Sequence, residues 1–200
     1  MHRAYRTLLA TALLAACATD ATAPSDDQLP LQRVAGGVRI VNTTDGPIAY
    51  TVLEYDYFSR TLASWGPCPN LDDCTLQPQE SAVVPEAEIG GYVPGAAAAV
   101  VLWWTVVPDG AGGKQVVEPR SALVPLAAGA SAVTATVRFV DVEGGCWALD
   151  TDSVRYEPLG LPAEFRVDGS AVQAVIESAT DVGTICMVGR LVRILAIAPR

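Results

Sequence analysis

The chain has almost no histidine: its 200 residues include only His2, at the very start of the sequence. A Ser-His-Asp triad, a histidine-ligated zinc site and a histidine general base all need an imidazole in the folded part of the protein, so these sites are excluded. Lysine is as scarce, because Lys114 is the only one and lies in a glycine-rich turn. No serine has the Gly-x-Ser-x-Gly context of a hydrolase nucleophile. We therefore expect a protein that is not an enzyme and needs no cofactor.

Positive charge is also in short supply. Lys and Arg total 13 against 22 Asp and Glu, which gives a formal net charge of -9. Such a surface repels the phosphates of nucleic acids and anionic lipid headgroups. We therefore expect no nucleic-acid partner. The hydrophobic share of 50% is enough to bury a core.

Apolar runs long enough to cross a membrane are missing as well. The longest apolar run after the N-terminal segment, residues 96–107, ends at Pro108 and is shorter than the ~20 residues that a membrane-spanning helix needs. The N-terminus has arginines, then a short apolar run, then small residues. This order is typical of an export signal.

The tetrapeptide LAAC at residues 14–17 resembles the lipobox of bacterial lipoproteins. The resemblance implies a signal peptide over residues 1–16 and a lipid on Cys17 that anchors the protein to a membrane. In that family, proteins kept at the inner membrane have Asp directly after the lipidated cysteine. Ala18 occupies this position here, which implies that the protein is anchored in the outer membrane and faces the periplasm. An ordinary export signal cleaved elsewhere, for instance after Ala23, is the alternative. Residues 17–33 are then the lipidated cysteine and a flexible linker rich in Thr, Asp, Ala and Pro.

Four cysteines remain after Cys17, and an even number in an exported protein predicts disulfides. Three pairings exist. We favour Cys68 with Cys74, because the ends of the CPNLDDC loop meet easily, and Cys146 with Cys186, which joins two distant strands. A four-thiolate metal site is the competing interpretation, but it lacks any Cys-x-x-Cys pair.

Short runs rich in Val, Ile, Thr and Tyr alternate with turn residues, which predicts an all-β protein. A small, uncharged segment at residues 126–131 suggests a boundary between two domains. We expect an immunoglobulin-like antiparallel β-sandwich at residues 34–126 and a second β domain at residues 132–200. A turn of helix fits residues 55–64. The expected strands are 38–42, 48–55, 81–84, 98–107, 116–124, 133–142, 146–150, 153–157, 165–167, 171–177 and 188–197.

Three blocks of the second domain resemble a small OB-like β-barrel module of uncharacterised bacterial envelope lipoproteins. They are GGCWAL at 144–149, YEPLGLPAEFRVDG at 156–169 and ICMVG at 185–189. The resemblance implies a fold and brings no chemistry with it.

Two groups of side chains are candidates for contacts. Trp103 and Trp104 are adjacent, so in a strand they point to opposite faces and one of them should be partly exposed. Together with Tyr92, it is the candidate contact surface, although a position under a loop such as WGPCP is the favoured interpretation. Four acidic residues around the GGCW turn are candidate calcium ligands, but they lack the spacing of a calcium loop and solvated charges are the favoured interpretation. They are Asp141, Glu143, Asp150 and Asp152.

The sequence thus predicts a lipid-anchored cell-envelope lipoprotein with a non-enzymatic, binding or structural role. An envelope protein, a peptide or a glycan is the expected partner. The alternative is an inhibitor that presents the Cys68–Cys74 loop, or a calcium-binding module of the periplasm.

Overall fold

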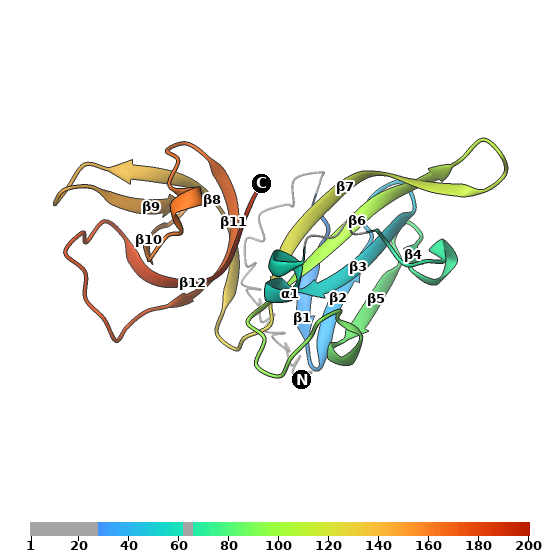
Figure 1. Cartoon of the computed structure of the whole chain (residues 1–200), viewed down its shortest axis with the longest axis horizontal. Coiled ribbons are helices and arrows are strands. Elements are labelled where there is room, and N and C mark those ends of the chain that lie inside the picture. The colour runs from blue at the N-terminus through green and yellow to red at the C-terminus, as the bar shows by residue number, and fades with distance from the viewer. Residues whose placement is uncertain (1–27, 62–65) are drawn as a thin grey trace, which may run out of the picture.

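A computed structural model describes residues 28–61 and 66–200 and confirms a mostly β protein. Figure 1 shows a sandwich made of strands β1 to β7 beside a barrel made of β8 to β12. The sandwich strands are Leu31–Val34 (β1), Gly37–Val41 (β2), Ile48–Glu54 (β3), Thr75–Leu76 (β4), Ser81–Pro85 (β5), Ala98–Pro108 (β6) and Lys114–Pro125 (β7). The barrel strands are Ser131–Val140 (β8), Cys146–Asp150 (β9), Arg155–Leu159 (β10), Ala171–Ser178 (β11) and Arg190–Pro199 (β12).

The sandwich packs a sheet of order β1-β2-β5 against a sheet of order β4-β3-β6-β7, and every pairing is antiparallel. Its core follows the two-residue period of the strands, with Ile40, Val52 and Trp103 on the facing sides. The helix α1 (Tyr55–Arg60) follows β3 directly. It is capped by the carboxylate of Glu54, which accepts a hydrogen bond from the Tyr57 amide at 2.7 Å.

Two details differ from the sequence-based expectation. The sandwich begins inside the segment expected to be a flexible linker, because β1 pairs with β2 and Leu29 is buried in the core. The predicted strand at 165–167 is wrong, since Phe165 ends the short 3-10 helix η3 (Ala163–Phe165) and the next two residues are in no strand. The helical turn predicted at 55–64 is confirmed by α1.

The second module is a closed barrel in the order β10-β12-β11-β8-β9. Four of its pairings are antiparallel, and the pair of β10 with β12 is parallel. This is the five-stranded Greek-key arrangement of an OB-like barrel. Val137, Leu149 and Val172 fill its interior, and the Trp147 ring packs edge-on against Phe139 with centroids 5.2 Å apart.

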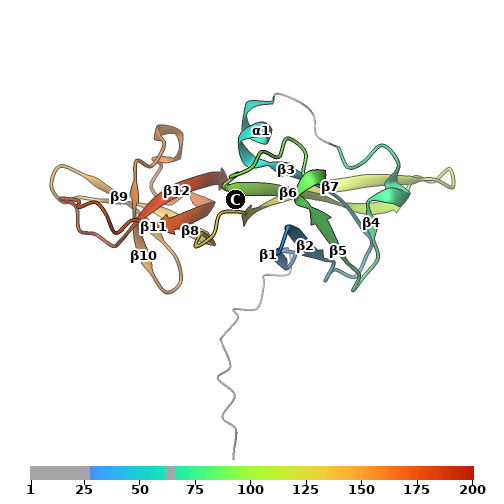
Figure 2. The same ribbon diagram turned by 90° about the horizontal axis from the view of Figure 1, so that it is seen from below.

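The barrel lies beside the β4-β3-β6-β7 sheet (Figure 2) and contacts its edge strand, β7. The apolar joint includes Val175 of β11 and Ala196 of β12, and it continues into the cluster on the outer face of the sheet that holds Trp104. The Tyr55 hydroxyl adds two hydrogen bonds, donating to the Ile197 carbonyl at 2.8 Å and accepting from the Ile197 amide at 3.2 Å. Strand β6 is buried on both faces over residues 98–104, which explains its apolar sequence there.

A buried glutamine completes the joint at the free edge of β7. The Gln173 side-chain oxygen accepts a hydrogen bond from the Leu123 amide at 2.8 Å. Its side-chain nitrogen donates to the Ser121 carbonyl at 3.2 Å. The glutamine amide thus pairs with β7 as a peptide unit of a neighbouring strand would.

Candidate recognition loop

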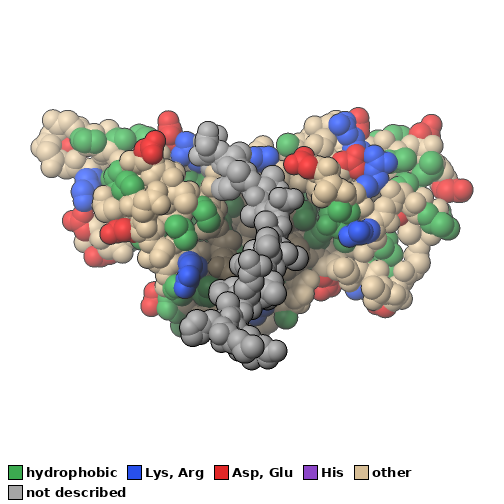
Figure 3. Space-filling model, turned by 180° about the vertical axis from the view of Figure 1, so that it is seen from behind, with side chains coloured by type: hydrophobic (Ala, Val, Ile, Leu, Met, Phe, Trp, Pro, Cys, Tyr) green, Lys and Arg blue, Asp and Glu red, His purple; other side chains and the backbone are tan. Residues whose placement is uncertain are grey.

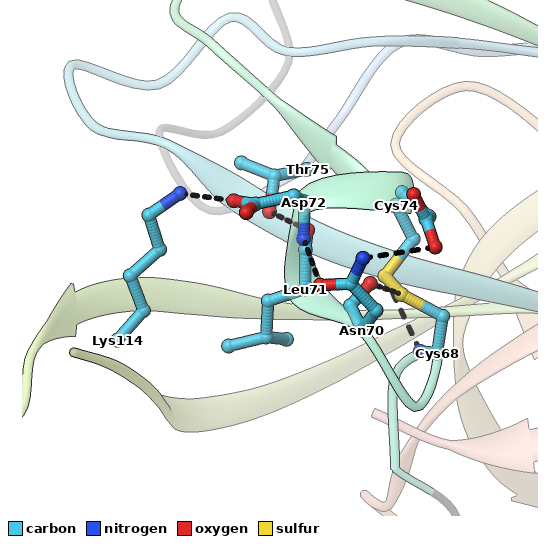
Figure 4. The surroundings of a disulfide bond; sticks show 8 residues. Cys68, Asn70, Leu71, Asp72, Cys74, Thr75 and Lys114 are labelled. Atoms are coloured by element: carbon cyan, nitrogen blue, oxygen red, sulfur yellow. Dashed lines mark hydrogen bonds and ion pairs between the residues drawn. A yellow bond between two sulfur atoms is a disulfide. The ribbon is translucent and has the colours of Figure 1, made fainter.

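The disulfide between Cys68 and Cys74 closes an exposed loop on the sandwich (Figure 4), as the sequence predicted. The two Cα atoms lie 6.0 Å apart. Cys74 packs with Ala49 and Val106 on the outer face of the sheet. The base of the loop is therefore fixed to a rigid surface, while Pro69 and Asn70 at its tip remain exposed.

Short-range hydrogen bonds fix the conformation of the loop. The Asn70 side-chain oxygen accepts from the Asp72 amide at 3.3 Å and so caps the 3-10 helix η1 (Leu71–Asp73). The Asn70 side-chain nitrogen donates to the Asp73 carboxylate at 3.1 Å. The Thr75 hydroxyl donates to the Leu71 carbonyl at 2.5 Å.

The single lysine of the chain ties the loop to β7. The Lys114 ammonium lies 2.5 Å from a carboxylate oxygen of Asp72, which is 42 residues away (Figure 4). Both side chains are largely exposed, so the ion pair contributes at most about 1 kcal/mol. Its effect is to orient the loop against the neighbouring hairpin.

An open cavity of about 360 Å³ separates the loop from the tip of the β6–β7 hairpin. The hairpin is itself well ordered, because the Asp109 carboxylate accepts from the Ala111 and Gly113 amides, both at 2.8 Å. The cavity is lined by Pro69, Asn70, Leu71, Asp72, Gly112, Gly113 and Lys114. Its polar groups are suited to hydrogen bonding with a peptide or a glycan.

The two adjacent tryptophans do not form a contact surface. Trp103 is 1% exposed in the sandwich core, and Trp104 is 7% exposed in the apolar cluster on the outer face of the sheet. The expectation that one of them is partly exposed is wrong, because Trp104 lies in an apolar cluster on the outer face of the sheet with Leu53 and Leu102, against which Phe58 of α1 packs. Tyr92 is half-buried, and its hydroxyl donates to the Glu86 carboxylate at 2.7 Å, which raises the pKa of the phenol.

The four acidic residues around the GGCW turn do not come together as a calcium site. Asp150 is bound instead by the Arg155 guanidinium, with oxygen–nitrogen distances of 2.6 and 2.8 Å, and these hydrogen bonds lower the pKa of its carboxyl group. Asp141, Glu143 and Asp152 are exposed. Among the described residues, no three His, Cys, Asp or Glu side chains are grouped to hold a metal ion.

The second predicted disulfide, Cys146 with Cys186, is also confirmed. It attaches the β11–β12 loop to the start of β9. Glu157 on β10, which sequence reasoning missed, is buried under the same loop and accepts hydrogen bonds from the Thr184 hydroxyl and, at 3.0 Å, from the Val188 amide. The predicted lipidation site, Cys17, lies outside the described residues.

Within the described part of the chain, no helix is both long and apolar enough to span a bilayer. No protein-family model, curated protein or solved structure matches the chain.

Proposed function

We propose that the chain is a lipoprotein of the bacterial cell envelope that acts by binding and not by catalysis. Its signal peptide is removed before Cys17, whose lipid anchors it in the outer membrane, facing the periplasm. The partner is an envelope protein, peptide or glycan, and the Cys68–Cys74 loop is the recognition element.

The observation that carries this proposal is the combination of exposure and rigidity in that loop. Its tip is exposed, yet the disulfide, the Asn70 cap and the pair of Lys114 with Asp72 leave it little conformational freedom. A loop that is ordered before binding loses less entropy when it binds, so a small contact area gives useful affinity.

The distribution of charge supports a protein or glycan partner over a nucleic acid. On the face in Figure 3, acidic and basic side chains are interspersed over both modules, and the described residues gather no continuous basic surface there. A polyanion needs such a surface.

An inhibitor is the second candidate function, and the same restraints favour it. Inhibitory loops are pre-organised and change little on binding. The two functions differ in their effect on the partner, since an inhibitor abolishes the activity of the enzyme that it captures and a simple binding protein does not.

Site-specific cross-linking in the intact envelope tests the recognition loop. A photoreactive phenylalanine analogue replaces Pro69 at the loop tip or, as a matched control, the exposed Val83 on β5. We expect a discrete cross-linked product from position 69 alone, and its loss when Cys68→Ser and Cys74→Ser are combined. Equal products from both positions, or a product that survives loss of the disulfide, would contradict the role of the loop. Mass spectrometry of the mature N-terminus tests the lipid on Cys17.

A further inference from the structure

The loop between β11 and β12 exposes apolar side chains at the end of the barrel that faces away from the sandwich (Figure 1). Residues 182–189 read VGTICMVG and contain no charged residue. Ile185 is 72% exposed and Met187 is 80% exposed. Val142 in the neighbouring β8–β9 hairpin adds a further exposed apolar side chain. Large apolar side chains grouped in this way mark an interaction site.

The exposure is not a consequence of a loose loop. The disulfide holds Cys186 to Cys146, and the Glu157 carboxylate holds the loop from both sides through Thr184 and Val188. Met187 has a φ of 49°, a left-handed conformation that a side chain other than glycine rarely adopts. The loop is therefore held in a disfavoured conformation that presents Ile185 and Met187 to the surroundings.

The polar groups of the loop are partly satisfied from within. The Cys186 amide donates to the Thr184 hydroxyl oxygen at 3.1 Å, and the Val188 amide donates to Glu157 at 3.0 Å. The Asp181 carboxylate, at the start of the loop, forms an ion pair with the Arg193 guanidinium, with an oxygen–nitrogen distance of 2.6 Å.

The chain length between the anchor and the barrel allows the loop to reach a membrane. Ten residues separate Cys17 from Gln28, so their covalent length limits the span to about 40 Å. Gln28 lines a shallow cavity together with Ala132, near the start of β8. From Ala132 to the end of β8 at Val140, the strand rises roughly 27 Å. The loop end of the barrel therefore lies within the reach that the tether permits.

We propose that the uncharged loop at residues 182–189 inserts its apolar side chains into the interfacial region of the bilayer that holds the lipid anchor. This inference rests on the proposed lipidation of Cys17. The anchor keeps the loop at a high local concentration beside the bilayer, so a contact of a few side chains is enough to orient the molecule. The barrel end then rests on the membrane, while the Cys68–Cys74 loop on the other module stays in the aqueous compartment.

Methionine oxidation provides a test with a single reporter. The sequence has two methionines, Met1 and Met187, and removal of the signal peptide leaves Met187 alone. The lipidated protein is reconstituted into vesicles of phosphatidylethanolamine and phosphatidylcholine and treated with peroxymonosulfate, an anion that remains in water. Mass spectrometry follows the addition of one oxygen atom to the thioether. The reference is the same protein in the unlipidated form.

We expect Met187 on vesicles to oxidise ~10-fold more slowly than in the reference, as for a loop that is inserted about nine tenths of the time. Ile185→Asp, at a mostly exposed position, should restore fast oxidation without changing the thermal midpoint. The matched control is Val93→Asp, at an exposed valine of the sandwich, and it should leave the protection intact.

Fast oxidation of Met187 in protein that floats with the vesicles would overturn the insertion while leaving the lipid anchor intact. A protein that does not float with vesicles would instead refute the anchor itself. Protection of Met187 in native envelope, but not in pure vesicles, would replace the bilayer with a protein partner and so also overturn the proposal.

Discussion

Replacing Gln173 by Leu removes the two hydrogen bonds that join the barrel to the edge of β7 while keeping the volume of the side chain. The Leu123 amide is buried, so losing its acceptor costs about 1–3 kcal/mol. The Ser121 carbonyl is only partly buried and regains water, so its loss costs about 1 kcal/mol. We expect Gln173→Leu to lower the free energy of unfolding by about 2–4 kcal/mol.

Urea unfolding followed by tryptophan fluorescence measures this change, because Trp103 and Trp104 report on the sandwich and Trp147 reports on the barrel. Gln32→Leu on β1 is the matched control, because that glutamine is exposed and its replacement should change the stability by less than about 0.5 kcal/mol. A Gln173→Leu protein as stable as the control would refute the idea that the amide substitutes for a strand. If one module of the Gln173→Leu protein unfolds at a lower urea concentration than the other, the joint also couples the unfolding of the two modules.

Two further predictions concern the barrel. Combining Cys146→Ser with Cys186→Ser opens a long loop and should destabilise the protein by about 4 kcal/mol, as chain-entropy arguments give. Removing the shorter disulfide with Cys68→Ser and Cys74→Ser should destabilise it by about 2 kcal/mol. Equal urea midpoints for the two double variants would contradict this prediction. Arg155 lowers the pKa of the Asp150 carboxyl group in the folded state. The ion pair therefore stabilises the folded protein above the unfolded-state pKa, about 3.9, and this stabilisation is lost as the pH falls through the lower folded-state pKa. Urea midpoints between about pH 6 and about pH 3 should therefore fall less for Asp150→Asn than for the wild type.

Much of the fold was predictable because strand periodicity and turn residues are local signals. Strand β9 has the bounds that the sequence predicted, and both disulfides pair as expected. The first strand was missed, because β1 is short and its LQRV sequence continues the polar composition before it. Gly36, with a φ of 74° in the turn to β2, was the signal that could have identified it.

The errors about exposed residues have a different cause. Trp104 is covered within an apolar cluster that other elements complete on the outer face of the sheet, and no local pattern within β6 encodes that packing. The same holds for the pair of Lys114 with Asp72 and for the bridge from Gln173 to β7, which join residues 42 and about 50 positions apart. Glu157 was missed because a carboxylate in a strand normally points to water, and here a loop fixed by a disulfide covers it.

The amide of Gln173 also affects how the molecule meets its own copies. Strand β7 is the last strand of its sheet, and a row of free backbone groups at such a border invites pairing with another chain. The glutamine and the adjoining barrel occupy part of that border, between Ser121 and Leu123. Separating the modules would therefore uncover a template for intermolecular sheet growth, which makes the joint a safeguard against aggregation at high local density.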